Sequence, residues 1–295
     1  MDYLDKYGYA PDREEIGRAI EMIAANMDNI ASEQVYKDCF SMMDLTTLKT
    51  DDTPASVAKL VEKVNAFHKS YPEWPLPASV CVFSNFAATV KEVRKEDFNI
   101  TVVSACFPSS QSFLEVKLKE CELAVENGAD EVDIVLALNA FLAGDYDSAA
   151  EEIRQVRSCI DAVAARQNRK VHLKVILETG LLRTPEKIAQ ASFLAMEAGA
   201  DFIKTSTGKV DVNATPAAAY VMCECISKFH AATGRKIGFK PAGGISSAAD
   251  ALCYYSIVSA ILGKDWLNKE LFRFGVSRVA NSILSAVEQK TISFF

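Results

Sequence analysis

Five charged side chains stand inside apolar runs of the sequence that have the length of β-strands. They are Asp44, Asp133, Lys174, Lys204 and Lys240. Moving a charge out of water into an apolar interior is costly, so each of these residues needs a partner or a task. A buried ion-pair network that only stabilises the fold is one interpretation. Five charges converging from five strands favour an active site instead.

Two of these lysines, Lys204 and Lys240, belong to consecutive strands, where two ammonium groups would repel each other. Repulsion and burial both disfavour the charged form, so one of the two amines can be neutral and nucleophilic near pH 7. A neutral amine condenses with an aldehyde or ketone to an iminium ion, which accepts electrons when a C–C bond breaks. Asp133 is the candidate for moving protons, directly or through a water molecule. Asp44 and Lys174 would position the substrate hydroxyls and the water.

Loops after the last three strands combine glycine with polar and cationic residues. Backbone N–H groups of such loops and of helix starts commonly bind phosphate in α/β barrels. Lys209 and Arg278 can add positive charge. The sequence therefore predicts a phosphate site from Ser206, Thr207, Gly208 and Lys209 after the sixth strand, Gly243 and Gly244 after the seventh, and Gly275, Ser277 and Arg278 after the eighth.

Strand and helix patterns alternate from about residue 38 onward, which indicates a βα series. The predicted strands are 40–45, 79–83, 100–106, 131–136, 172–178, 202–206, 237–241 and 271–275, each a short apolar run typical of buried parallel strands. The predicted helices between them are 54–69, 112–127, 145–166, 185–198, 215–232 and 248–262.

Closure of these strands into a single (β/α)₈ TIM barrel is the favoured α/β architecture, and an open doubly wound sheet is the alternative. The first strand is not followed by the GxGxxG pattern of dinucleotide-binding sheets. An extra N-terminal helix is predicted over residues 11–30. We expect a helical extension over residues 1–32, which would cap the barrel or contact a neighbour, and the barrel itself over residues 33–295.

Composition excludes several classes of protein. The 295 residues are 49% apolar and 24% charged, and the net charge of −7 leaves no basic stripe for nucleic acid. No apolar run is long enough to span a membrane. Eight irregularly spaced cysteines and no visible secretory leader predict reduced thiols in the cytoplasm. The histidines are isolated, and we expect neither a metal site nor a cofactor.

The sequence resembles the 2-deoxyribose-5-phosphate aldolase family over roughly residues 38–287. The matching segments are 43–48, 128–133, 173–180, 202–210 and 238–244, and the most specific motifs are Lys-Thr-Ser-Thr-Gly from Lys204 and Lys-Pro-Ala-Gly-Gly from Lys240. The resemblance implies a class I lyase that cleaves 2-deoxy-D-ribose 5-phosphate reversibly into acetaldehyde and D-glyceraldehyde 3-phosphate. It makes Lys204 the Schiff-base lysine, Lys240 its perturbing partner and Asp133 the proton-transfer residue. It also implies a homodimer.

The resemblance assigns further residues to the substrate. Asp44, Thr46, Cys81, Lys174 and Thr207 match positions around the sugar, and Ser246 falls in the phosphate-binding loop together with the glycines given above.

Three positions depart from the family pattern. Many relatives have arginine where this chain has Ser246 and serine where it has Arg278, so we expect Arg278 to hold the phosphate instead. Some relatives carry a C-terminal tyrosine that reaches the active site, but residues 292–295 contain none. Two alternatives therefore stay open: a related aldolase for a different or non-phosphorylated aldehyde substrate, and a non-catalytic barrel that binds a sugar phosphate.

Overall fold

The structure is a computed structural model that describes residues 3–295. Residues 1 and 2, which belong to the predicted N-terminal extension, lie outside the described residues.

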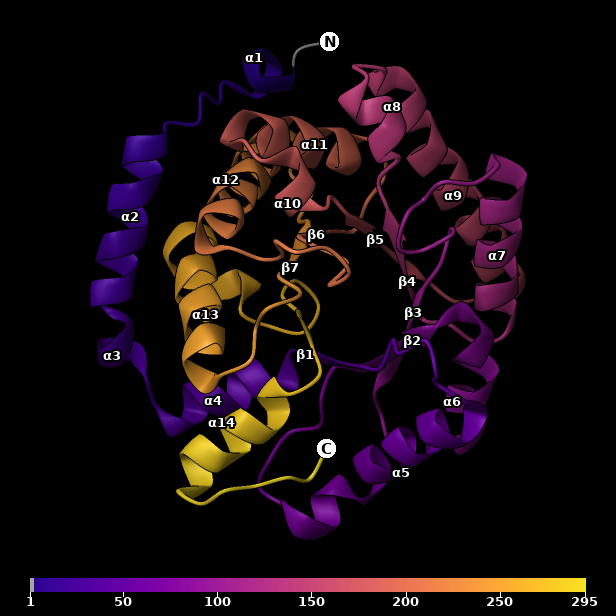
Figure 1. Ribbon diagram of the computed structural model, residues 1–295, viewed down its shortest axis with the longest axis vertical. Coiled ribbons are helices and arrows are strands. Elements are labelled where there is room, and N and C mark those ends of the chain that lie inside the picture. Colours follow the sequence, from indigo (N-terminus) through magenta and orange to yellow (C-terminus); the bar gives the residue numbers. More distant parts are fainter. Residues whose placement is uncertain (1–2) are drawn as a thin grey trace.

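Eight parallel strands form one sheet that closes on itself, with helices around it (Figure 1). The sheet order runs β7-β6-β5-β4-β3-β2-β1-β8, and bridges from Phe239 to Phe272 and from Ala242 to Gly275 join its two edges. The predicted TIM barrel is therefore confirmed. The strands are β1 (Met43–Thr46), β2 (Ser79–Phe83), β3 (Asn99–Val103), β4 (Glu131–Val135), β5 (His172–Ile176), β6 (Phe202–Lys204), β7 (Gly238–Lys240) and β8 (Phe274–Val276).

Helices surround the barrel and connect its strands. Several begin at a side-chain cap, such as Thr53 before α5 and Ser247 before α13, which satisfy N–H groups that lack a partner in the first turn. The connecting helices are α5 (Pro54–Ser70), α6 (Ala87–Val93), α7 (Leu114–Glu126), α8 (Leu138–Leu142), α9 (Tyr146–Arg166), α10 (Thr179–Leu182), α11 (Pro185–Glu197), α12 (Pro216–Thr233), α13 (Ala248–Leu262) and α14 (Val279–Glu288). Short 3₁₀ turns, η1 (Ser84–Phe86) and η2 (Lys264–Trp266), complete the connections.

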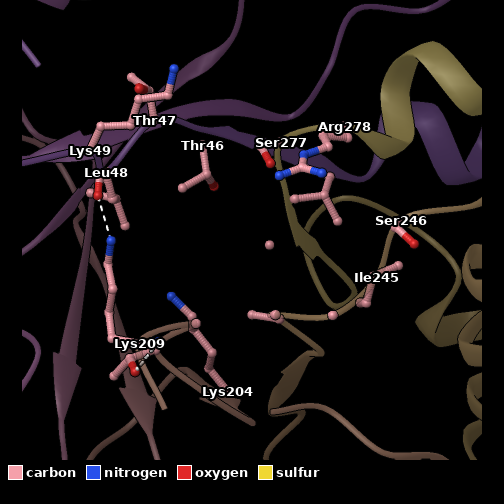
Figure 2. A pocket seen from close by; sticks show the side chains of 17 residues that line it. Thr46, Thr47, Leu48, Lys49, Lys204, Lys209, Ile245, Ser246, Ser277 and Arg278 are labelled. Atoms are coloured by element: carbon pink, nitrogen blue, oxygen red, sulfur yellow. Dashed lines mark hydrogen bonds between the residues drawn. The ribbon is translucent and has the colours of Figure 1, made fainter. Parts of the chain in front are cut away.

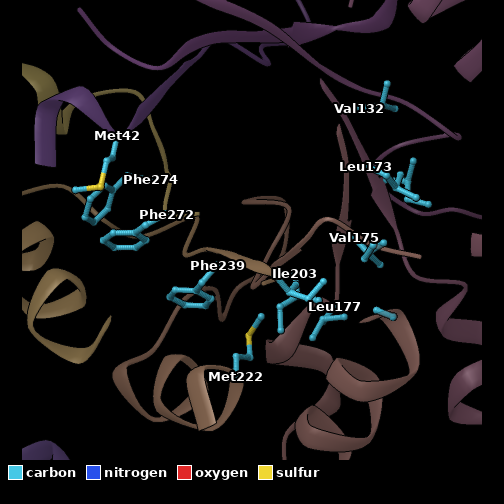
Figure 3. Packing of buried hydrophobic residues seen from close by; sticks show 14 of the residues in the cluster. Met42, Val132, Leu173, Val175, Leu177, Ile203, Met222, Phe239, Phe272 and Phe274 are labelled. Atoms are coloured by element: carbon cyan, nitrogen blue, oxygen red, sulfur yellow. The ribbon is translucent and has the colours of Figure 1, made fainter. Parts of the chain in front are cut away.

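The strand residues alternate between the helices and the barrel interior. Outward-facing Ile203 and Phe239 pack with Met222 of α12, as Figure 3 shows. Between these apolar positions, Lys204 and Lys240 turn inward. One apolar layer outside the strands therefore holds the barrel together while the charged residues share its interior.

The predicted strand boundaries needed several corrections. Phe40 ends up in helix α4 (Glu33–Ser41), and the first strand starts only at Met43. The third and fifth strands stop early because the chain turns sharply after them: Cys106 and Glu178 have φ of 60° and 55°. The eighth strand starts at Phe274 instead of Leu271.

The predicted helix 11–30 is interrupted at Asn26, giving α2 (Arg13–Ala25) and α3 (Met27–Ile30), and α1 (Tyr3–Tyr7) precedes them. Helix α2 lies outside α12 and α13 on the flank of the barrel (Figure 1). The division at residue 32 stays a prediction. Within residues 3–295, no helix is both long and apolar enough to cross a membrane.

Candidate active site

A cavity of about 630 Å³ opens at the carboxyl ends of the strands, where the loops after β1, β6, β7 and β8 meet (Figure 2). Catalytic sites of (β/α)₈ barrels lie at this end. Eleven of the sequence-predicted site residues line the cavity: Thr46, Lys204, Thr207, Gly208, Lys209, Gly243, Gly244, Ser246, Gly275, Ser277 and Arg278. The other six, Asp44, Cys81, Asp133, Lys174, Ser206 and Lys240, are fully buried.

Lys204 connects the buried charges with the cavity. Its side chain is 4% exposed, and its Nζ lies 2.9 Å from Oδ2 of Asp133. Burial lowers the pKa of Lys204, and the positive charge of Lys240 lowers it further against the opposing effect of Asp133. The amine at the floor of the cavity is therefore the one that gives up its proton most readily.

Lys240 lies on the neighbouring strand in direct register with Lys204. Its Nζ is 2.7 Å from Oδ2 of Asp133 and 2.5 Å from Oδ2 of Asp44. Burial disfavours its charge, but the two carboxylates outweigh burial and raise the pKa of Lys240. The pKa values of the two adjacent lysines are therefore shifted in opposite directions, as expected when one amine is charged and the other neutral.

Asp133 is shared by three amines. Besides Lys204 and Lys240, it lies 3.2 Å from Nζ of Lys174. Burial favours the neutral acid, yet the three lysines together lower the pKa of Asp133. It is therefore a carboxylate held between ammonium groups.

Two charged residues in the barrel interior were missed by the sequence analysis. Arg273 donates to Asp44 at 2.6 Å and to both carboxylate oxygens of Glu131 at 2.6 and 3.0 Å. Glu131 also pairs closely with Lys174. Both side chains are fully buried. The available signal was an arginine between two phenylalanines in the middle of the predicted strand 271–275.

Glycine gives the predicted phosphate loops their shape. Gly208, Gly243 and Gly244 have φ of 78–79°, in the left-handed region. A Cβ on Gly243 would also lie 2.7 Å from the side chain of Asn213. At these three positions the backbone itself forms the wall of the cavity, with no side chain between.

Two of the polar residues in these loops are held by internal hydrogen bonds. Glu178 accepts hydrogen bonds from the N–H and the hydroxyl of Thr207, at 3.1 and 2.5 Å. Nζ of Lys209 donates to the carbonyl of Leu48 across the cavity at 2.6 Å (Figure 2). The loop after β6 is thereby fixed to the loop after β1.

Ser246 is less available for binding phosphate than the sequence suggests. Its N–H and hydroxyl both donate to Asp250, at 2.9 and 3.3 Å, and the N–H of Ser247 donates there as well. Arg278, in contrast, lines the cavity and makes no hydrogen bond or ion pair to any residue of 3–295 (Figure 2). A phosphate would therefore find a free guanidinium at Arg278.

Cys81 lies in a small apolar cluster with Leu48 and Val103, against Phe83 and Phe107. Burial raises the pKa of its thiol. It therefore contributes a neutral, apolar surface beside the lysines. No group of three or more His, Cys, Asp or Glu side chains in the described part of the chain is arranged to hold a metal ion.

Residues 292–295 lie between α14 and α5 and contribute nothing to the cavity. The N–H groups of Phe294 and Phe295 donate to Oδ1 of Asn281, and both rings pack on Phe67.

Comparison with known proteins adds to this geometry. The sequence model of the DeoC/LacD family aldolases matches residues 39–255. The deoxyribose-phosphate aldolase of Homo sapiens is 42% identical over 262 residues, which cover 85% of this chain and 78% of the relative. That of Mus musculus is 39% identical, with 85% and 78% covered.

Solved structures with the same fold include one described as QR15, an aldolase, with 25% identity, a TM-score of 0.67 and 85% and 97% of the two chains covered. A deoxyribose phosphate aldolase from Aeropyrum pernix, described as a tetramer, has 21% identity and a TM-score of 0.66, with 94% and 98% covered.

Proposed function

This chain belongs to the DeoC/LacD family of aldolases, and we propose that it cleaves 2-deoxy-D-ribose 5-phosphate reversibly through a Schiff base on Lys204. The products are acetaldehyde and D-glyceraldehyde 3-phosphate. One observation carries the assignment of the lysine: Lys204 is a buried amine with a lowered pKa that still lines the cavity.

The first step is attack of the Lys204 lone pair on C1 of the open-chain sugar. A proton passes from nitrogen to oxygen to give the carbinolamine, whose hydroxyl then takes a second proton and leaves as water. Asp133 touches both Lys204 and Lys240, so it can relay that second proton from the Lys240 ammonium to the departing hydroxyl. The iminium ion that results carries the positive charge on nitrogen.

Cleavage follows when a base removes the proton of the C3 hydroxyl. The C2–C3 bond breaks, C3 becomes the aldehyde of D-glyceraldehyde 3-phosphate, and the electron pair moves through C1 to the nitrogen, leaving a neutral enamine. Protonation of C2 restores the iminium ion. Water then adds to C1, acetaldehyde leaves, and Lys204 is again an amine.

Asp133 works in this scheme as a carboxylate. Because the surrounding lysines lower the pKa of Asp133, it does not store a proton for long and is suited to passing one on. Asp44 and Lys174 are buried below it and line no part of the cavity. We therefore assign both to orienting Asp133 and Lys240, in place of direct contact with the sugar hydroxyls.

We assign the substrate phosphate to the part of the cavity away from Lys204. The loops after β6, β7 and β8 meet there, which suits binding of phosphate by backbone N–H groups, and Arg278 and Lys209 add charge. Lys49 also lines the cavity. Cations without lining carboxylates favour a phosphorylated substrate over a neutral sugar. Thr46 and Thr207 are placed to contact the sugar between the phosphate and Lys204.

The test compares the cleavage of 2-deoxyribose 5-phosphate and 2-deoxyribose. We expect kcat/KM to be larger for the phosphorylated sugar by about 10- to 10²-fold, since a charge-assisted phosphate contact contributes about 1.5–3 kcal/mol. Equal values for the two sugars would remove the phosphate assignment and leave the lysine chemistry untouched.

We also propose an oligomeric state and a cellular compartment for the protein. The family resemblance favours a homodimer, and α7 exposes Val116 and Leu123, with Phe113 immediately before it. The eight free thiols suit the reducing cytoplasm. Light scattering at several protein concentrations tests the homodimer, and a monomer at all of them would contradict it.

A further inference from the structure

Seven ionisable side chains form one connected cluster inside the barrel, beneath the cavity. Three are carboxylates and four are bases, and each is buried. They are Asp44 of β1, Glu131 and Asp133 of β4, Lys174 of β5, Lys204 of β6, Lys240 of β7 and Arg273 just before β8.

The bases do not share the carboxylates equally. Lys174 contacts all three carboxylates, Lys240 contacts Asp44 and Asp133, and Arg273 contacts Asp44 and Glu131. Among the described residues, Lys204 contacts one carboxylate only, and that one already serves Lys174 and Lys240.

Three negative charges balance three positive charges, so the cluster is neutral only when one of the four bases has lost its proton. An uncompensated buried charge is strongly disfavoured. The base with the fewest partners is Lys204, which is also the one that reaches the cavity. The pKa directions agree: the pKa of Lys204 is lowered, whereas those of Lys174, Lys240 and Arg273 are raised.

We propose that Arg273 and Glu131, which touch neither Lys204 nor the cavity, are positioning residues that set the protonation of Lys204 through the charge balance of this cluster. The inference rests on the proposed role of Lys204 as the nucleophile. A guanidinium keeps its proton at any working pH, so Arg273 supplies a fixed positive charge. Arg273 pairs with Asp44 and Glu131 through this fixed charge. Lys204 is then the one base whose proton is not needed to balance the carboxylates.

Other ionisable groups next to the cluster do not change this count. His172 lies 4.0 Å from Glu131, and burial lowers its pKa, which favours neutral imidazole. Burial raises the pKa of the Cys81 thiol, which is therefore neutral as well. Lys49, Lys209 and Arg278 stand around the cavity, on its solvent side.

The experiment follows the exchange of the methyl protons of acetaldehyde with D₂O by NMR, as a function of pH. Exchange needs the Schiff base and its enamine, and acetaldehyde has no phosphate whose own titration would distort the profile. The rate rises with pH as Lys204 loses its proton, so the midpoint of the acid limb reports its pKa in the free protein.

Opposite shifts are expected from the two residues. Arg273→Gln removes a positive charge, so a protonated Lys204 restores balance and the midpoint moves up by about one pH unit. Glu131→Gln removes a negative charge and moves the midpoint down by about as much. The double variant and Arg273→Lys both keep the balance, so their midpoints stay near that of the unaltered protein.

Arg157→Gln is the matched control because it breaks an ion pair with Asp201 elsewhere in the protein. Its midpoint stays unchanged. Circular dichroism identifies any variant that does not fold, and the remaining three variants still test the charge balance. Midpoints that do not move, or that move the same way in both single variants, overturn the inference. Absence of exchange in the unaltered protein would instead contradict the proposed function.

Discussion

Burial alone does not distinguish Lys204, because Lys174 and Lys240 are buried at least as completely. Their surroundings differ. The other two amines each touch two or more carboxylates, whereas Lys204 touches one and opens to the cavity. A lysine with too few counter-charges and access to substrate has the properties of an amine nucleophile.

Replacing this lysine separates chemistry from stability. Lys204→Met removes the amine and keeps a similar volume, so turnover of 2-deoxyribose 5-phosphate falls by about 10³-fold or more. The melting temperature stays equal or rises, since a poorly paired buried amine is gone. Steady-state kinetics and calorimetry measure the two effects. Lys187→Met, on an exposed position of α11, is the control and retains full activity.

Arg278 has a narrower role. In Arg278→Ala we expect KM for 2-deoxyribose 5-phosphate to rise about 10-fold, the effect of losing about 1.4 kcal/mol of a charge-assisted contact, with kcat little changed. Cleavage of unphosphorylated 2-deoxyribose is unaffected. The exposed Arg18→Ala on α2 serves for comparison. An unchanged KM would show that the phosphate is held elsewhere.

The sequence was informative for residues whose type conflicts with their surroundings. Asp133 and Lys204 stood out because a charge inside a buried strand is costly. Glu131 did not, because a polar residue at the start of a strand is ordinary. Nor could the commitment of Ser246 to Asp250 be predicted, since it depends on how helix α13 begins.

Strands β6 and β7 are only three residues long, and their close contact depends on Gly238. A Cβ on Gly238 would lie 2.3 Å from the ring of Phe202, which fills the barrel interior below Lys204. Alternation along the strands was predicted from the sequence. The end of each strand was not, because sharp turns such as that at Glu178 follow from contacts with neighbouring loops.

Gly238→Ala tests this packing. The added methyl forces the Phe202 ring or the strand to move, so the free energy of unfolding falls by about 1–3 kcal/mol. Gly17→Ala in α2 is the matched control, since its Cβ meets nothing within 4 Å, and it raises stability by about 0.5–1 kcal/mol. Denaturant titration of both variants gives the comparison. Equal effects would mean that Phe202 has room to shift.

Closure of the barrel brings the five charged residues that were singled out in the sequence together in one site. These residues run from Asp44 of β1 to Lys240 of β7, and the barrel adds Arg273, which lies 229 positions from Asp44 in the sequence. The alternating helices and strands predicted the barrel, and the barrel predicted that the inward charges converge. Which carboxylate pairs with which base follows from the stagger of the strands, and no local pattern encodes that stagger.

The same cluster makes stability depend on pH. Its counter-ions lower the pKa of Glu131 from 4.5 to about 2, against the effect of burial. Below pH 4.5 the unfolded chain therefore binds a proton that the folded protein does not, and stability is lost as the pH falls toward 2. Thermal melts across this range should show a flatter dependence in Glu131→Gln. An identical slope in both proteins would contradict the assigned pairing.

The mechanism depends above all on a covalent bond between Lys204 and the substrate aldehyde. Incubation with acetaldehyde and borohydride reduces the iminium ion to a stable ethyl-amine, and peptide mass mapping locates it. We expect one ethyl group on the peptide that contains Lys204, and none there in Lys204→Met. An adduct on another lysine, or none on Lys204 in the active protein, would contradict the mechanism.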